Sequence, residues 1–408
     1  MSITWKKGNQ FKPEILLNRI AENRTISSEG GVSFSGFELE DCLPAIKSML
    51  SFPSVTSDLD TSNLVWKGLA RVTNELTKEN FLKAINSVLN EKLATKERIY
   101  FLLTSISINH QDIPKKLKIL EAELTFHAKS YPLRFKSRNN LLKTLDVPVA
   151  MEPDSYCRVV VKVKAKTAEA ATNRALRALD LQRAVWCMMS NPQMQLISYS
   201  SSSARPINVI RLGSKHTLHL ESGAPAEDNI WYEPGFVEVG IHRIKNPDIA
   251  KHNVRVAMRG LLNSNYAEKL ISSLLRYVRA LDESEANTAY LRLWGALESL
   301  VTPEIADYDK LITRCSFLFQ DTDFHRQLLV HLREYRNRNV HSGEESEKAR
   351  THCFQLQLYF VNLIWFHLNN AKFFKSLNEV NSFLELPPCK PDLERRLELT
   401  KRALKFIR

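Results

Sequence analysis

The sequence lacks the features that mark membrane, secreted and zinc-binding proteins. No apolar run approaches the roughly 18 residues that a transmembrane helix needs, and the opening MSITWKKGNQFK contains no hydrophobic signal core. We therefore expect neither membrane insertion nor secretion, and a cytoplasmic location. The six cysteines are scattered without a C-x-x-C pair, which favours reduced, buried thiols over a zinc site. No pattern calls for a metal or a cofactor, and we expect neither.

Composition and charge suit a globular protein with an anionic partner. Hydrophobic residues make up 44% and charged residues 25% of the 408 residues, enough for two or three domains that each bury a core. The net charge is +12, of which the residues from 246 onward contribute 24 − 20 = +4 and the earlier residues 33 − 25 = +8. A modest positive balance is also common in proteins that bind no nucleic acid, so charge alone does not decide.

The first 245 residues read as two regions. Residues 1–97 are mainly helical, with helices expected at 40–50 and 62–93 and a short strand at 32–39. In residues 98–245, runs rich in β-branched and aliphatic residues predict strands at 99–108, 116–126, 158–166, 194–200, 206–212 and 217–220. An Ala- and Leu-rich helix is predicted at 167–189. We expect an α+β domain with a mostly antiparallel sheet, serving to sense a signal or to position RNA.

The strand RVVVKVKAK (158–166) alternates valines with basic residues. Lys162, Lys164 and Lys166 fall on one face, where they are candidates for contacting an RNA backbone. The other interpretation, which we favour, is a solvated face, since lysines occupy such faces routinely. An RNA-recognition sheet would carry interleaved aromatic side chains, and this strand has none.

Residues 246–408 follow a helical pattern throughout. Apolar spacing predicts helices at 254–262, 267–281, 285–301, 308–319, 324–338, 344–374 and 392–408. The helix at 344–374 is apolar on more than one side, so it is either central in a bundle or covered by a second chain.

The segment HLREYRNRNVHSGEE (331–345) combines an arginine, an asparagine and a histidine. We expect its helix to end near Arg338 and a new helix to begin at Ser342, where Ser342 and Glu345 match a capping box. A single continuous helix would set Arg336 and His341 roughly 140° apart around the axis. At a junction between two helices, His341 could instead turn back toward Arg336.

This segment resembles the Arg-x4-6-His signature of HEPN domains, with Arg336, Asn337 and His341 at the matching positions. The stretch YVRALDESEANTAYLRLWGALESLV (277–301) resembles the helix that precedes the signature in the Apea-like branch. The likeness covers residues 246–386. It implies an all-α HEPN bundle, a homodimer whose two motifs form one composite site, and a metal-independent endoribonuclease.

The resemblance implies a role for each matching residue. Arg336 would hold the non-bridging phosphate oxygens, His341 would act as general base or acid, and Asn337 would orient the phosphate. Arg338 is a secondary candidate for RNA contact. Products would carry a 2′,3′-cyclic phosphate and a 5′-hydroxyl.

The resemblance also implies a biological setting. It is antiviral defence by abortive infection, or toxin activity, with tRNA or another RNA as target and a phage-derived trigger or inhibitory partner. Two plainer interpretations remain open. The HEPN module could be non-catalytic and serve dimerisation or nucleic-acid binding, and arginines near a helix end often only interact with the last carbonyls.

Overall fold

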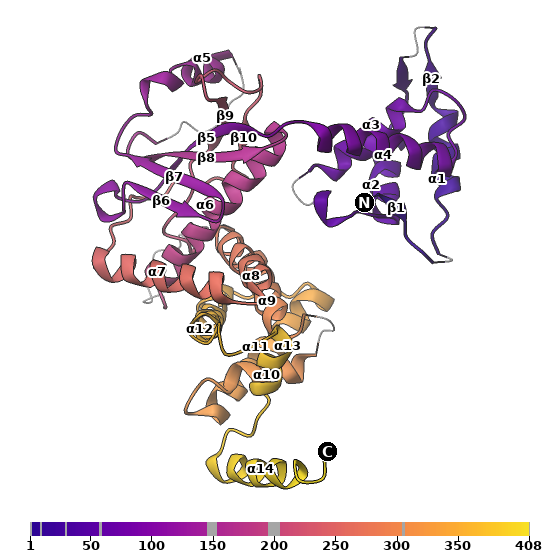
Figure 1. The fold of residues 1–408 in the computed structure, drawn as a ribbon. Coiled ribbons are helices and arrows are strands. Elements are labelled where there is room, and N and C mark those ends of the chain that lie inside the picture. The colour runs from indigo at the N-terminus through magenta and orange to yellow at the C-terminus, as the bar shows by residue number, and fades with distance from the viewer. Residues whose placement is uncertain are drawn as a thin grey trace.

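The computed structural model describes residues 2–8, 10–28, 31–56, 59–144, 153–194, 205–303 and 307–407. Along the chain, a small helical region is followed by an antiparallel sheet with its covering helix and then by a helical bundle (Figure 1). The α+β class predicted from the sequence is confirmed. None of the helices in these ranges is both long and apolar enough to cross a bilayer.

The N-terminal region has a hydrophobic core of its own. Leu64, Leu69 and Ile85 lie at its centre. Two of its helices start at side-chain caps, Asp60 for α3 and Thr77 for α4, while Pro13 starts α1, which the sequence did not predict. The elements are β1 (Thr4–Trp5), α1 (Pro13–Glu22), β2 (Arg24–Ile26), β3 (Val32–Phe34), α2 (Glu38–Met49), β4 (Leu50–Ser51), η1 (Ser54–Thr56), α3 (Thr61–Arg71) and α4 (Lys78–Ala94).

The sheet has six strands in the order β10-β9-β5-β8-β7-β6, and every neighbouring pair is antiparallel. Helix α6 packs across one face, where it covers Leu102, Val159 and Val161. The elements are β5 (Arg98–Ile106), η2 (His110–Asp112), β6 (Lys116–Ile119), β7 (Ala122–His127), η3 (Leu133–Phe135), α5 (Ser137–Thr144), β8 (Cys157–Ala165), α6 (Ala168–Ser190), β9 (Lys215–Leu220) and β10 (Trp231–Tyr232).

Two predicted strands differ from the structure. Residues 116–126 form a hairpin rather than one strand, because the chain turns at Leu120, which adopts a left-handed conformation (φ 52°). Residues 206–212 form no strand beyond a single bridge from Leu212, because the N–H groups of Ile207 and Asn208 donate to the Leu281 carbonyl at the end of α8. Most of the strand predicted at 194–200 lies outside the described residues.

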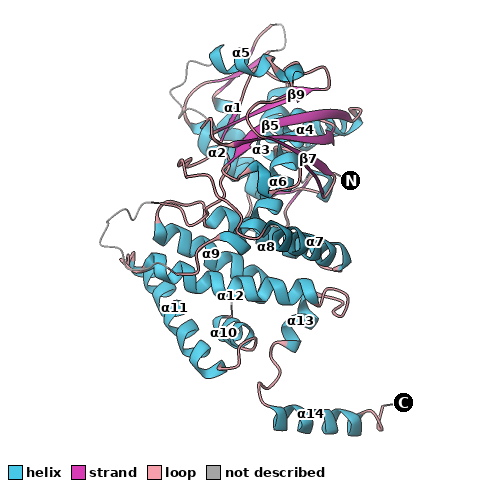
Figure 2. Ribbon diagram, turned by 90° about the vertical axis from the view of Figure 1, so that its left-hand side faces the viewer, coloured by secondary structure: helices cyan, strands magenta, loops and turns pink. Residues whose placement is uncertain are grey.

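The elements of the C-terminal bundle are α7 (Pro247–Asn263), α8 (Ala267–Ala280), α9 (Ala286–Val301), α10 (Tyr308–Ser316), α11 (Thr322–Ser342), α12 (Ala349–Asn369), α13 (Leu377–Phe383) and α14 (Lys390–Ala403). Of these, α8, α9 and α10 follow the predicted helices to within three residues, whereas α7 begins seven residues before its predicted start at 254. Figure 2 shows α12 running through the middle of the bundle, and its Leu356, Phe360 and Leu363 are completely buried. Of the two interpretations left open for this helix, central in the bundle or covered by a second chain, the structure shows the first. Helix α14 stands apart from the bundle and buries no residue (Figure 2).

A buried group of charges joins the sheet to the bundle. Arg183 of α6 donates to both carboxylate oxygens of Asp282 at 2.7 Å and to Asp180 at 2.8 Å. Arg279 of α8 pairs with Asp180 and with Glu233, which also contacts His216 of β9. One continuous apolar core accompanies this network from the sheet through α6 into α8, α9 and α12.

Candidate functional site

Helix α11 continues to Ser342, four residues past the end predicted from the sequence. Asp321 caps its first turn, and the left-handed Gly343 (φ 65°) ends it by donating its N–H to the Asn339 carbonyl at 3.0 Å. The next helix begins only at Ala349 and has no side-chain cap. The predicted capping box at Ser342 is therefore wrong, because Ser342 closes α11 and Gly343 acts as its stop signal.

The unbroken helix separates the two central candidates. Five positions along an α-helix correspond to roughly 140° around its axis, so Arg336 and His341 point in different directions. His341 is exposed, and among the described residues it forms no hydrogen bond or ion pair. Asn337 lies one turn before His341 and thus on the same side of the helix, and its Oδ1 accepts a long bond of 3.4 Å from Arg336. The structure therefore does not bring Arg336 and His341 together within one chain.

The opposite side of α11 is firmly packed. Leu329, Leu332 and Tyr335 are buried, and the Tyr290 hydroxyl donates to the Leu332 carbonyl at 2.5 Å. The Tyr335 hydroxyl donates to the side-chain oxygen of Asn287. Packing on this side leaves the motif residues on a rigid helix end, with Asn337 and His341 facing outward.

The same asparagine also holds the chain that follows α11. The side-chain oxygen of Asn287 accepts the backbone N–H of Ser346 at 3.1 Å as well as the Tyr335 hydroxyl. Asn287 sits in the first turn of α9, whose cap is Glu285. No local pattern indicates this role, because a polar residue just after a helix cap is ordinary.

The three arginines near the end of α11 have different partners. Arg333 pairs with Asp309 at 2.8 Å, and Arg338 pairs with Glu344 at 2.9 Å. Arg336 is half-buried, and its guanidinium lies over the ring of Tyr308, 5.1 Å from the centroid. Within the described part of the chain, Arg336 is thus the one of the three that has no carboxylate partner, so its N–H donors other than the one that Asn337 accepts remain available to an anion.

The aromatic ring under the Arg336 guanidinium is itself held by a second aromatic residue. Tyr308, in the first turn of α10, packs against Trp294 of α9 at a centroid distance of 6.2 Å. The Trp294 indole donates to Glu298 at 2.7 Å, so this carboxylate of the LWGALE stretch is engaged by tryptophan. A cation over an aromatic face is held without losing its hydrogen-bond donors, so Tyr308 can position Arg336 and leave its N–H groups open to a ligand. The sequence did not single out Tyr308.

Lys162 and Lys164 belong to β8 and Lys166 follows its last residue, so all three lie with the sheet, away from α11 (Figure 1). Lys164 is exposed, while Lys162 is half-buried and lies opposite Glu123 in the register with β7. Lys166 donates to the Leu93 carbonyl at the end of α4 and so helps to hold the N-terminal region. The structure does not bring these lysines together with the motif residues.

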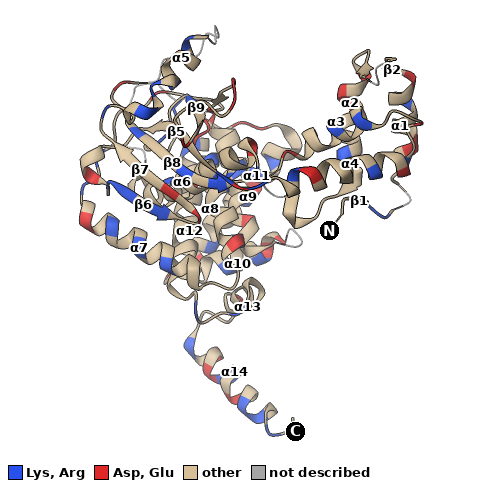
Figure 3. Ribbon diagram, turned by 45° about the horizontal axis from the view of Figure 1, so that its top comes forward, with Lys and Arg blue, Asp and Glu red and all other residues tan. Residues whose placement is uncertain are grey.

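The face that carries these lysines is partly covered. Val160 packs in a small cluster with Phe101 and Phe135, and Arg158 is buried and donates to the Pro153 carbonyl at 3.0 Å. The expectation of a solvated face therefore holds for Lys164, while Val160 and Arg158 are covered by neighbouring chain. Figure 3 shows further basic positions on α7, on the β6–β7 hairpin and along α14.

Within the described ranges, no three His, Cys, Asp or Glu side chains are grouped as metal ligands. Five of the six cysteines are buried and free, and Cys389 is exposed. No protein-family model matches the sequence, and no curated protein or solved structure matches it either. Function must therefore be inferred from the residues themselves.

Proposed function

We propose that this chain is a metal-independent endoribonuclease that uses the end of α11, with Arg336 and His341 as its catalytic residues. The proposal is supported by one observation above all: Arg336 is stacked on Tyr308 with its donors free of carboxylates, while Arg333 and Arg338 on either side are paired. An arginine held in this way suits a phosphate, because its planar fork matches two phosphate oxygens.

The chemistry needs three events at one phosphodiester. A general base takes the proton of the 2′-hydroxyl, whose oxygen attacks the phosphorus. The bond to the 5′-oxygen breaks, and a general acid gives that oxygen a proton. The products are a 2′,3′-cyclic phosphate and a 5′-hydroxyl. Imidazole titrates near neutral pH and can serve as base or acid, and Arg336 stabilises the charge that develops on the non-bridging oxygens.

The separation of Arg336 and His341 around α11 favours a site shared by two chains. A phosphate held by Arg336 of one copy would be reached by His341 of a second copy, and two copies supply one histidine as base and one as acid. The exposure of His341 supports this arrangement, because its ring can meet a facing helix end, and Asn337 lies on the same side of α11. Asn337 would orient the phosphate, and Arg338 would contact RNA beyond it.

The substrate class follows from the resemblance to HEPN domains rather than from the geometry. We propose tRNA or another RNA of the host cell as target, and a defence or toxin role in which a phage component or an inhibitory partner controls the activity. The competing proposal is a non-catalytic module for dimerisation and nucleic-acid binding. The two differ in whether RNA is cut.

The test is cleavage of 5′-labelled RNA by the full chain in the presence of EDTA. We expect cutting by the wild type, cyclic-phosphate ends on the products, and a loss of at least about a hundredfold in Arg336→Ala and in His341→Ala. Arg326→Ala, on an exposed position of the same helix, and His252→Ala, an exposed histidine of α7, are matched controls that should cut normally. RNA binding without cleavage, with or without added Mg²⁺, would favour the binding module instead.

A further inference from the structure

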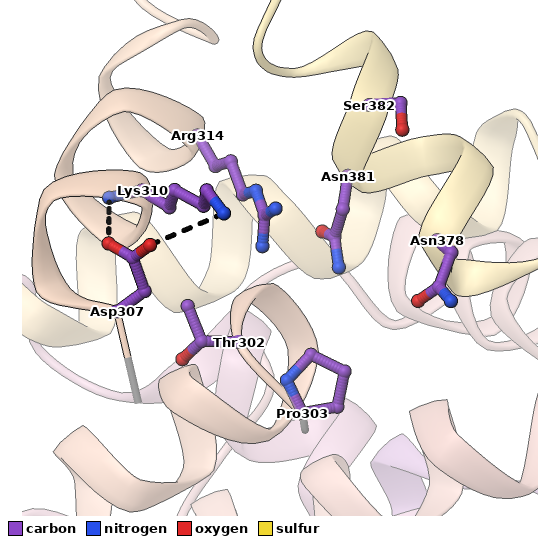
Figure 4. Close-up of a pocket in the computed structure, with 8 residues that line it drawn as sticks. All are labelled: Thr302, Pro303, Asp307, Lys310, Arg314, Asn378, Asn381 and Ser382. Carbon is purple, nitrogen blue, oxygen red and sulfur yellow. Dashed lines mark hydrogen bonds and ion pairs between the residues drawn. The ribbon is translucent and has the colours of Figure 1, made fainter. Parts of the chain in front are cut away.

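A polar cavity lies between the end of α9, α10 and α13, on the side of α10 that faces away from α11. It has a volume of about 380 Å³, within the range of small-molecule sites. Figure 4 shows Lys310 and Arg314 reaching into it from α10 and Asn381 from α13, above Thr302 and Pro303. The remaining lining residues are Asp307, Asn378 and Ser382.

One side chain in this cavity has an unmet hydrogen-bonding capacity. Asn381 is only 2% exposed, and its amide N–H donates to the Leu300 carbonyl at 3.3 Å. Its side-chain oxygen is buried and accepts no hydrogen bond within the described part of the chain. Buried acceptors of this kind are nearly always satisfied in native proteins. The oxygen therefore calls for a donor that enters the cavity.

Two cationic side chains in the same cavity, Arg314 and Lys310, have N–H groups that form no hydrogen bond within the described part of the chain. Arg314 uses three of its five N–H groups, two on Glu385 and one on the Val301 carbonyl. Lys310 uses one of its three N–H groups in the ion pair with Asp307, at 3.3 Å. The two free N–H groups on each side chain can therefore bind an anion without breaking the existing contacts. Asp307 and Glu385 offset part of the positive charge, so the free N–H groups rather than the net charge favour an anion. A phosphate group suits the pair, because its several oxygens can accept from both side chains.

We propose that this cavity binds a small phosphate ester that also carries N–H or O–H donors. Lys310 and Arg314 hold its phosphate, and the side-chain oxygen of Asn381 accepts one of its donors. The requirement for both parts separates such a ligand from inorganic phosphate, which has no group outside the phosphate itself to reach Asn381, and from an uncharged nucleoside, which leaves both cations unused.

The cavity and the end of α11 share one turn of helix. Asp307 and Lys310 line the cavity, while the residues between them turn to α11, with Tyr308 under Arg336 and Asp309 paired with Arg333. A ligand in the cavity thus contacts the same turn that positions Arg336. Binding itself does not depend on the proposed nuclease activity, so the two proposals can fail separately.

The test is calorimetric titration of the full chain, in a phosphate-free buffer, with AMP, ribose 5-phosphate, inorganic phosphate and adenosine. We expect at least one of the two esters to bind, more tightly than inorganic phosphate does, and adenosine not to bind. Lys310→Ala and Asn381→Leu should each weaken the binding of that ester about tenfold or more. Lys310 is half exposed, so the first variant keeps the test informative if Asn381→Leu does not fold.

Lys251→Ala is the matched control. Lys251 forms the same pair with an aspartate three residues earlier, at 3.2 Å, but on α7 and outside the cavity. Ester binding should be unchanged in this variant. The proposal is overturned if neither ester binds at millimolar concentration, if inorganic phosphate binds as well as the esters do, or if Lys310→Ala and Lys251→Ala behave alike.

Discussion

The replacement Asp282→Asn should strongly destabilise the protein, because it removes one negative charge from the network that joins α6 to α8. Arg183 is 0% exposed and donates to both oxygens of Asp282 at 2.7 Å, and Asn208 donates to the same carboxylate at 2.9 Å. Asparagine keeps the shape but leaves Arg183 with Asp180 as its remaining carboxylate. Breaking a buried pair in this way costs about 3–5 kcal/mol, a large part of the stability of a typical domain.

Urea unfolding followed by circular dichroism measures this loss. We expect the midpoint to fall in proportion to a decrease of about 3–5 kcal/mol in the free energy of unfolding, with little change in slope. The matched control is Asp248→Asn, which removes an exposed aspartate paired with Lys251 at 3.2 Å and should change stability by less than about 1 kcal/mol. A decrease below about 1 kcal/mol for Asp282→Asn would mean that the network contributes little, and would refute the reasoning.

Three further variants test other parts of the fold. Burial lowers the pKa of His367 to about 3, so as the pH falls below 6.5 the unfolded chain binds a proton at this histidine and the folded chain does not. Between pH 6.5 and 5 the wild type should therefore lose about 2 kcal/mol more stability than His367→Gln. Equal losses in the two proteins would contradict this. Gly343→Ala should cost about 1 kcal/mol in thermal unfolding, because alanine is strained at φ 65° although nothing crowds its side chain, and an unchanged melting temperature would argue against the left-handed stop. Tyr335→Phe removes the bond to Asn287 and should cost about 1 kcal/mol, whereas a neutral result would show that this contact does not hold the end of α11.

Periodicity predicted the elements that pack one face against the main core. The alternating valines of β8 and the apolar spacing of α8 and α9 indicated the type and approximate bounds of each element, although neighbouring chain also covers Arg158 and Val160 on the other face of β8. The same signal failed where the backbone satisfies its hydrogen bonds elsewhere. Ile207 and Asn208 have strand-like neighbours in the sequence, yet their N–H groups bind the end of α8.

The candidate site was predicted in its residues but not in its geometry. Arg336, Asn337 and His341 do lie at the end of a helix, but the capping-box pattern at Ser342 placed that end too early. The competing signal was Gly343, whose left-handed conformation ends α11 at Ser342, four residues past the predicted end, and keeps His341 within the helix. Tyr308 and Asn287, which position the end of α11, come from distant parts of the sequence and carry no local pattern.

The most direct test of a site shared between chains is RNA cleavage by mixed subunits. Wild type and His341→Ala chains are unfolded together, refolded at equal amounts and assayed in EDTA at constant total protein. If one site needs both histidines, only wild-type pairs cut, and activity falls to about one quarter of the undiluted wild type, because random pairing makes a quarter of the dimers fully wild type. Activity of about one half, as expected for chains that each cut alone, would contradict the shared site, and no cleavage by wild type itself would contradict the proposed function.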